Sequence, residues 1–107
     1  MLDEILDKLG QDEVLCQLAE ESAELSKAAL KYRRALGNTG NVTPVTAEEA
    51  YENLIEEIAD VNLCLAVLGL YGGLPAIEAS RVADRKAKRW HKRLFGGEAD
   101  DVVSDQE

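Results

Sequence analysis

The chain has 107 residues, of which 31% are charged and 5% aromatic, and its formal net charge is −9. This length fits a single domain, and the excess of carboxylates argues against a stable nucleic-acid partner, whose phosphates would repel it. The sequence shows no secretory signal and no run of the ~18 apolar residues that a membrane span needs. We therefore expect a cytoplasmic protein with no membrane partner.

The first half of the chain predicts a short helix and then a long one. Apolar residues at helical spacing predict a helix over residues 2–9, which Gly10 ends. A stretch without glycine or proline predicts a helix from Asp12 to Leu36, with an apolar stripe made of Val14, Leu18, Leu25, Ala29 and Tyr32. Residues 37–45 are typical of a loop, which could serve as a plain linker or as a lid.

A central helix is predicted next. Thr46 and Glu49 form the pattern of a capping box, and the helix that begins there should run to about Leu70. Beyond Asp60 it is almost wholly apolar, and a helix of this character belongs inside a bundle. Its expected core side chains are Tyr51, Leu54, Ile55, Ile58, Val61, Leu65 and Leu68.

The last predicted helix runs from Pro75 to about Phe95, and its second half is rich in Lys and Arg. Together these elements predict an all-α fold, a four-helix-type bundle with a short extra N-terminal helix. We expect residues 1–95 to form this fold as a single domain. Residues 96–107 are acidic with few apolar side chains, which predicts a disordered tail.

Two pairs of carboxylates are the sharpest chemical signal in the chain. Glu21 and Glu24 are three residues apart in the second helix, so both lie on one side of it. Glu57 and Asp60 repeat this step in the central helix. Brought together in a bundle, the four would raise one another's pKa values. A hard divalent cation relieves that repulsion, and all-oxygen ligation favours Mg²⁺, with Mn²⁺ as a substitute.

The carboxylates allow two other interpretations. A di-iron bundle also gathers carboxylates, but it takes a Glu-x-x-His motif from each of two helices. The single histidine, His91, follows Lys88 at that spacing, which argues against iron. The second interpretation stays open: the carboxylates could be solvated helix faces with local partners, since Glu is a strong helix former.

Cations stand where they could hold phosphates. Lys27 and Lys31 continue the face of Glu24, and they form either a solvated face or the cationic edge of a site. In the last helix, Lys86 and Arg89 are candidate phosphate contacts. Carboxylate-bound Mg²⁺ that keeps several waters commonly holds a phosphate chain as well. Acid pairs together with these cations therefore suggest a site that cleaves polyphosphates.

The paired motif resembles the signature of MazG-like nucleotide pyrophosphohydrolases, which belong to the all-α NTP pyrophosphatase superfamily. It consists of Glu21-x-x-Glu24 followed by Glu57-x-x-Asp60, each pair on a long helix and followed by an aliphatic residue. The resemblance covers about residues 15–90. It implies Mg²⁺-dependent hydrolysis of a nucleoside triphosphate to the monophosphate and pyrophosphate. It also implies a homodimer or tetramer, and the small chain with its apolar central helix agrees with this.

Carried over by motif, the family's site residues fall on the acid pairs. The resemblance implies that one of these carboxylates, or the adjacent Glu20 or Glu56, orients the attacking water. The implied metal ligands are Glu21, Glu24, Glu57 and Asp60.

Two features depart from the family. The segment between the acid pairs, residues 25–56, is longer than in compact members. The last helix keeps its cations and Trp90 but lacks the asparagine that relatives often carry between Lys and Arg. Nothing in the sequence identifies the preferred base, although Tyr51 and Trp90 could stack on one. The alternatives to an enzyme are a helical module that binds a nucleotide without cutting it and a protein-interaction module.

Overall fold

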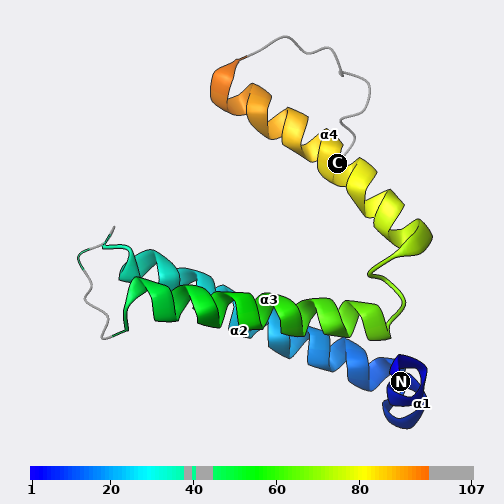
Figure 1. Cartoon of the computed structure of the whole chain (residues 1–107). Helices are drawn as coiled ribbons and strands as arrows, with labels where there is room; N and C mark the ends of the chain where they lie inside the picture. The colour runs from blue at the N-terminus through cyan, green and yellow to red at the C-terminus, as the bar shows by residue number, and fades with distance from the viewer. Residues whose placement is uncertain (38–39, 41–44, 97–107) are drawn as a thin grey trace. The chain divides into compact units, whose positions relative to one another are not determined.

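The computed structural model describes residues 1–37, 40 and 45–96, and every regular element within them is an α-helix (Figure 1). This confirms the predicted all-α fold. None of the described helices has both the length and the apolar character that crossing a membrane requires. The four helices are α1 (Leu2–Leu9), α2 (Gln11–Ala35), α3 (Ala47–Val67) and α4 (Gly73–Phe95).

The chain divides into two compact units, Met1–Tyr71 and Gly72–Glu107. The first unit holds α1, α2 and α3, and the second holds α4. The single-domain organisation of residues 1–95 stays a prediction. The acidic tail, apart from Gly96, lies outside the described residues, as do most residues of the loop expected over 37–45.

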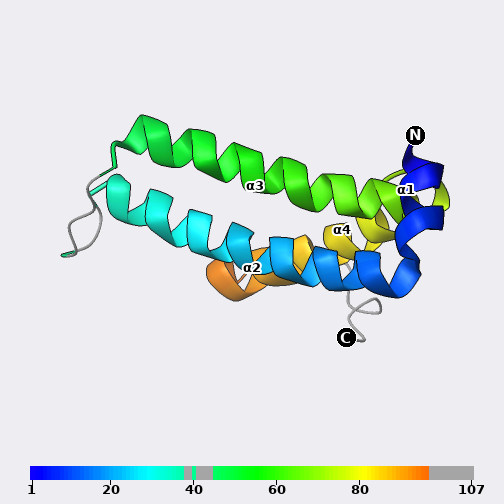
Figure 2. The ribbon, with the colours of Figure 1, turned by 90° about the horizontal axis from the view of Figure 1, so that it is seen from below.

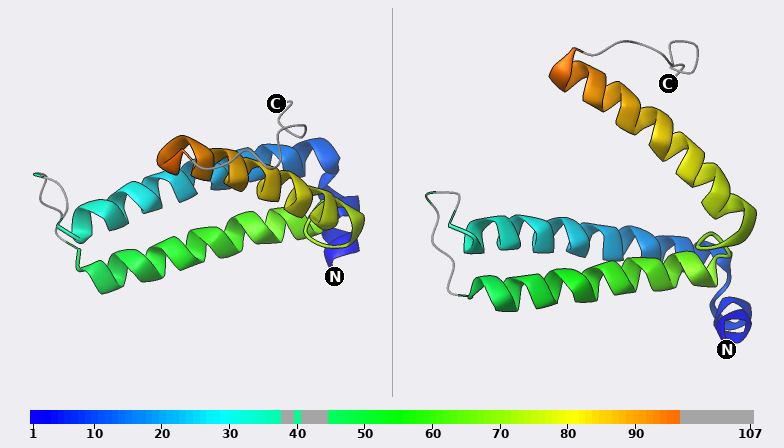
Figure 3. Two further views of the ribbon diagram at one scale, coloured as in Figure 1. Left: turned by 90° about the horizontal axis from the view of Figure 1, so that it is seen from above. Right: turned by 45° about the horizontal axis from the view of Figure 1, so that its top comes forward.

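In the first unit, α2 and α3 form an antiparallel hairpin. The two helices lie side by side in Figures 2 and 3, and α1 packs at the end where α2 begins and α3 ends. Ala28 and Ala50 are 2% and 1% exposed, and such small side chains allow two helix backbones to approach closely. Near the loop end of the hairpin, the rings of Tyr32 and Tyr51 pack with their centroids 5.7 Å apart.

The facing sides of the hairpin follow seven-residue steps. Residues seven apart lie on nearly the same side of a helix. Four buried residues mark these sides, Val14 and Ala28 on α2 and Ala50 and Cys64 on α3. Midway between each buried pair stands a carboxylate, Glu21 on α2 and Glu57 on α3. Each helix therefore carries an acidic residue at a position in its core-facing line.

Part of the predicted core is placed differently. On α2 the buried alanine is Ala28, and Ala29 is exposed, because the contact line runs through Glu21 rather than along an all-apolar stripe. On α3 the side chains of Tyr51, Ile55 and Ile58 are 50%, 45% and 38% exposed. The apolar pattern extends around much of α3, but among the described residues of this unit the helices that pack against it are α1 and α2 alone.

The capping box at the start of α3 is confirmed. The amide of Glu49 donates to Thr46 Oγ1 at 3.1 Å, and the amide of Thr46 donates to Glu49 Oε1 at 3.0 Å. These bonds satisfy amides that the first turn of a helix leaves without intrahelical acceptors.

Removing this cap should destabilise the hairpin measurably. Thr46→Ala should lower the free energy of unfolding by about 1 kcal/mol, because the Glu49 amide loses its acceptor. Urea unfolding followed by circular dichroism measures the change. Thr46→Ser keeps the hydroxyl and should stay close to wild type. Equal losses for the two variants would contradict a capping role.

Candidate metal centre

Three of the predicted carboxylates meet between α2 and α3. One oxygen from each of Glu21, Glu57 and Asp60 lies within 4.8 Å of the others. Glu21 and Glu57 are half-buried and Asp60 is exposed, so the group opens to solvent on one side. The antiparallel hairpin thus joins acidic residues that are far apart in the sequence.

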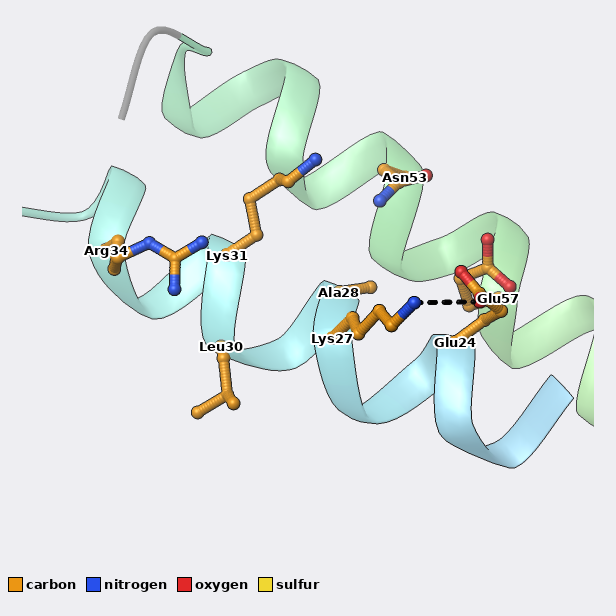
Figure 4. A pocket seen from close by; sticks show the side chains of 8 residues that line it. All are labelled: Glu24, Lys27, Ala28, Leu30, Lys31, Arg34, Asn53 and Glu57. Carbon is orange, nitrogen blue, oxygen red and sulfur yellow. Dashed lines mark hydrogen bonds and ion pairs between the residues drawn. The ribbon is translucent and has the colours of Figure 1, made fainter. Parts of the chain in front are cut away.

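Glu24 lies beside this group without being part of it. Its Oε2 is 3.3 Å from Nζ of Lys27, the contact drawn as a dashed line in Figure 4. Both side chains are largely exposed, and exposed ion pairs contribute only about 0.2–1 kcal/mol. Exchanging Lys27 for a metal ion would therefore cost Glu24 little.

Glu57 is the least satisfied member of the group. Its Oε1 is buried and has no hydrogen-bond partner among the described residues. Burial, followed by the charges of Asp60, Glu21, Glu24 and Glu56, raises the pKa of Glu57 above the ordinary value of 4.5. A carboxylate in such surroundings is stabilised by a proton or by a cation.

Without metal, this carboxyl group should make the fold less stable as the pH rises. Its pKa is raised in the folded chain, so the penalty is absent below the ordinary pKa of 4.5, grows between that value and the folded pKa, and is constant above the folded pKa. In EDTA, Glu57→Gln should therefore be more stable than wild type at about pH 8 and lose this advantage near about pH 4. Urea unfolding of both proteins at each pH checks this, and an advantage independent of pH would contradict it.

The spacing of the three carboxylates suits a hard divalent cation. Oxygens that share one Mg²⁺ at 2.0–2.1 Å lie about 3–4 Å from one another. Small side-chain rotations would bring the described oxygens, now within 4.8 Å, to that spacing. A bound cation would also give the buried Oε1 of Glu57 a partner.

A cavity of about 420 Å³ adjoins the carboxylates toward the loop end of the hairpin (Figure 4). Glu24 and Glu57 form one end of its wall. The volume falls within the range of about 300–1,000 Å³ that is typical of small-molecule sites. The remaining wall residues are Lys27, Ala28, Leu30, Lys31, Arg34 and Asn53.

The sequence prediction found part of this wall. Lys27 and Lys31, predicted as substrate contacts, both line the cavity, whereas Arg34 and Asn53 were not predicted. Helical spacing could have found them, because Arg34 is seven residues after Lys27 and Asn53 is four residues before Glu57.

The other two predicted phosphate contacts stand on α4. Lys86 and Arg89 belong to the second unit, whereas the carboxylates and the cavity belong to the first. Their contact with phosphate stays a prediction.

Similarity to known proteins assigns no function to the chain. No family model, curated protein or solved structure matches the chain. The features of the chain that indicate a function are the carboxylates and the cavity beside them. Together they offer hard oxygen ligands next to cations, which are the groups that a complex of a divalent metal with a phosphate chain requires.

Proposed function

We propose that the chain is a Mg²⁺-dependent nucleoside triphosphate pyrophosphohydrolase of the MazG-like kind, which releases the nucleoside monophosphate and pyrophosphate. One observation carries the proposal: a buried oxygen of Glu57, with no hydrogen-bond partner in the described part of the chain, lies in a carboxylate group that borders a cavity lined by cations. The carboxylates fit a divalent metal, and the cavity fits the phosphates that such a metal commonly binds.

The carboxylates would hold the metal and one proton of the reaction. Glu21, Glu57 and Asp60 are the metal ligands in this proposal, and Glu24 joins them when it leaves Lys27. When bound, Mg²⁺ would neutralise phosphate charge and help to generate a water nucleophile. A carboxylate of the group, or neighbouring Glu56, accepts the proton of the attacking water.

The cations would hold the end of the triphosphate that leaves. The water oxygen forms a bond to the α-phosphorus, and the bond from that phosphorus to the bridging oxygen of the β-phosphate breaks. The bridging oxygen takes the electron pair and departs with pyrophosphate. Lys27, Lys31 and Arg34 line the cavity where this group would lie, so they stabilise the charge that develops on it.

We also propose that the active form is a homo-oligomer. Tyr51, Ile55 and Ile58 follow one another at helical spacing and form an exposed apolar stripe on α3. A second copy would remove such a stripe from water. Analytical ultracentrifugation should give at least twice the chain mass of 11.7 kDa, and Ile55→Glu should lower it. A wild-type monomer at micromolar concentration would contradict this part of the proposal.

The enzymatic activity is tested with a panel of canonical and damaged nucleoside triphosphates, in Mg²⁺ or in EDTA, with products separated by ion-exchange chromatography. We expect monophosphate and pyrophosphate in equal amounts, and only with Mg²⁺. Diphosphate and inorganic phosphate would instead indicate a phosphatase. Mg²⁺-dependent nucleotide binding without products would select a non-catalytic binding module. If neither Mg²⁺ nor a nucleotide changes the melting temperature, a protein-interaction module is favoured. A ligand that binds the native state would raise the melting temperature.

A further inference from the structure

A second cavity, of about 120 Å³, lies on the other side of the carboxylates, at the end of the hairpin where α1 packs. Its walls are mainly aliphatic. Helix α1 contributes Ile5 and Leu9. Helix α3 contributes Leu63, Cys64 and Val67. On α2, the wall residues are Val14 and Gln17.

One wall residue of this apolar cavity contacts the carboxylate group directly. Gln17 lines the cavity, and its Nε2 donates to Glu21 Oε2 at 2.8 Å. Cys64 lines it as well, and burial and then the charges of Glu21 and Asp60 raise the pKa of its thiol. The thiol therefore lies within electrostatic reach of two of the proposed metal ligands.

Three chemically different regions thus follow one another along the hairpin. The cationic cavity lies toward the loop, the carboxylates lie in the middle, and the apolar cavity lies at α1. Lys27 and Gln17, which belong to the two cavities, are ten residues apart on α2, a rise of about 15 Å along the helix axis. An extended nucleoside triphosphate has a similar length from its base to its last phosphate.

We propose that the apolar cavity at α1 receives the nucleobase, so that the substrate lies along the hairpin with its base at α1 and its terminal phosphates beside Lys27 in the cationic cavity. This inference rests on the proposed function and adds the direction of the substrate and the residues that contact its base. A phosphate would lose its hydration in this cavity without gaining a charged partner there. The face of a base gains by burial against such aliphatic walls.

The experiment separates the base from the phosphates by comparing a nucleoside triphosphate with inorganic tripolyphosphate, which lacks a base. Leu9→Trp and Ile5→Trp fill the cavity from α1, and Leu15→Trp is the control, because Leu15 is an exposed leucine that does not line the cavity. The measurements are KM and kcat for the nucleotide, Ki for Mg²⁺-tripolyphosphate, and the melting temperature. Methyl NMR of wild type follows Ile5, Leu9 and Val67 as each ligand is added.

We expect each filling variant to raise KM for the nucleotide about tenfold or more, with kcat and the Ki of tripolyphosphate near wild type. The control should leave all three unchanged. In wild type, the three methyl groups should shift with a non-hydrolysable nucleotide and not with tripolyphosphate.

Three outcomes would overturn the inference. An unchanged KM with a raised melting temperature would identify the cavity as a packing gap. If the filling variants weaken the binding of nucleotide and of tripolyphosphate equally, or if both ligands shift the methyl groups, the base binds elsewhere. Hydrolysis by wild type would in that case still support the proposed function. Wild type that neither binds nor hydrolyses any nucleotide with Mg²⁺ would defeat the proposed function, and the base assignment with it.

Discussion

Glu57→Gln should lower Mg²⁺-dependent pyrophosphate release at least about 100-fold, since changes in groups that merely support metal ligands already cost about 10–100-fold. The amide is similar in size to the carboxylate but brings no negative charge to the cluster with Glu21 and Asp60. The same change should abolish the increase in melting temperature that Mg²⁺ gives to wild type. Steady-state kinetics and thermal unfolding, each with and without Mg²⁺, measure the two effects.

Two comparisons distinguish a loss of metal binding from a loss of folding. In EDTA at neutral pH the variant should unfold at higher denaturant than wild type. The half-buried Glu57 side chain, whose Oε1 has no hydrogen-bond partner among the residues that the structure describes, then carries no charge. A variant that is more stable and yet inactive cannot owe its inactivity to unfolding. Glu52→Gln, an exposed change on the same helix, should keep both activity and the response to Mg²⁺. Pyrophosphate release that survives Glu57→Gln would defeat the site assignment.

The all-α fold and the approach of the acid pairs follow from information local to each helix. Caps, glycines and helical spacing place α2 and α3, and helices that follow one another along a chain usually pack side by side. The three-residue step then sets each pair of acids on one side. The sequence therefore predicts that the two acid pairs, Glu21 with Glu24 and Glu57 with Asp60, form one group. The hairpin brings three of these carboxylates together, and Glu24 lies beside them.

The remaining features depend on the register between the helices, which no single helix encodes. Whether Ala28 or Ala29 is buried is decided by which side of α2 meets α3. Helical spacing places Asn53 on the side of Glu57, but only the pairing of α2 with α3 brings Asn53 and Ala28 to the wall of one cavity. The same pairing brings Gln17 and Cys64 to the wall of the other. Whether Lys86 and Arg89 of α4 contact phosphate depends on how the two units of the chain are arranged, which helical spacing does not specify.

Arg34→Ala should raise KM for the nucleotide about tenfold or more, because a hydrogen bond to a charged group contributes about 1.5–3 kcal/mol and 1.4 kcal/mol is tenfold in affinity. Arg33→Ala is the matched control: both arginines stand in the last turn of α2, so both changes remove one charge from the same helix end. Only Arg34 lines the cavity, whereas Arg33 is exposed beside it. Kinetics at two salt concentrations should show the KM of wild type rising with salt more steeply than that of Arg34→Ala, since screening weakens the lost contact. Equal effects of the two substitutions would mean that the helix end attracts nucleotides only through its net charge, and the cavity would then not be the phosphate site.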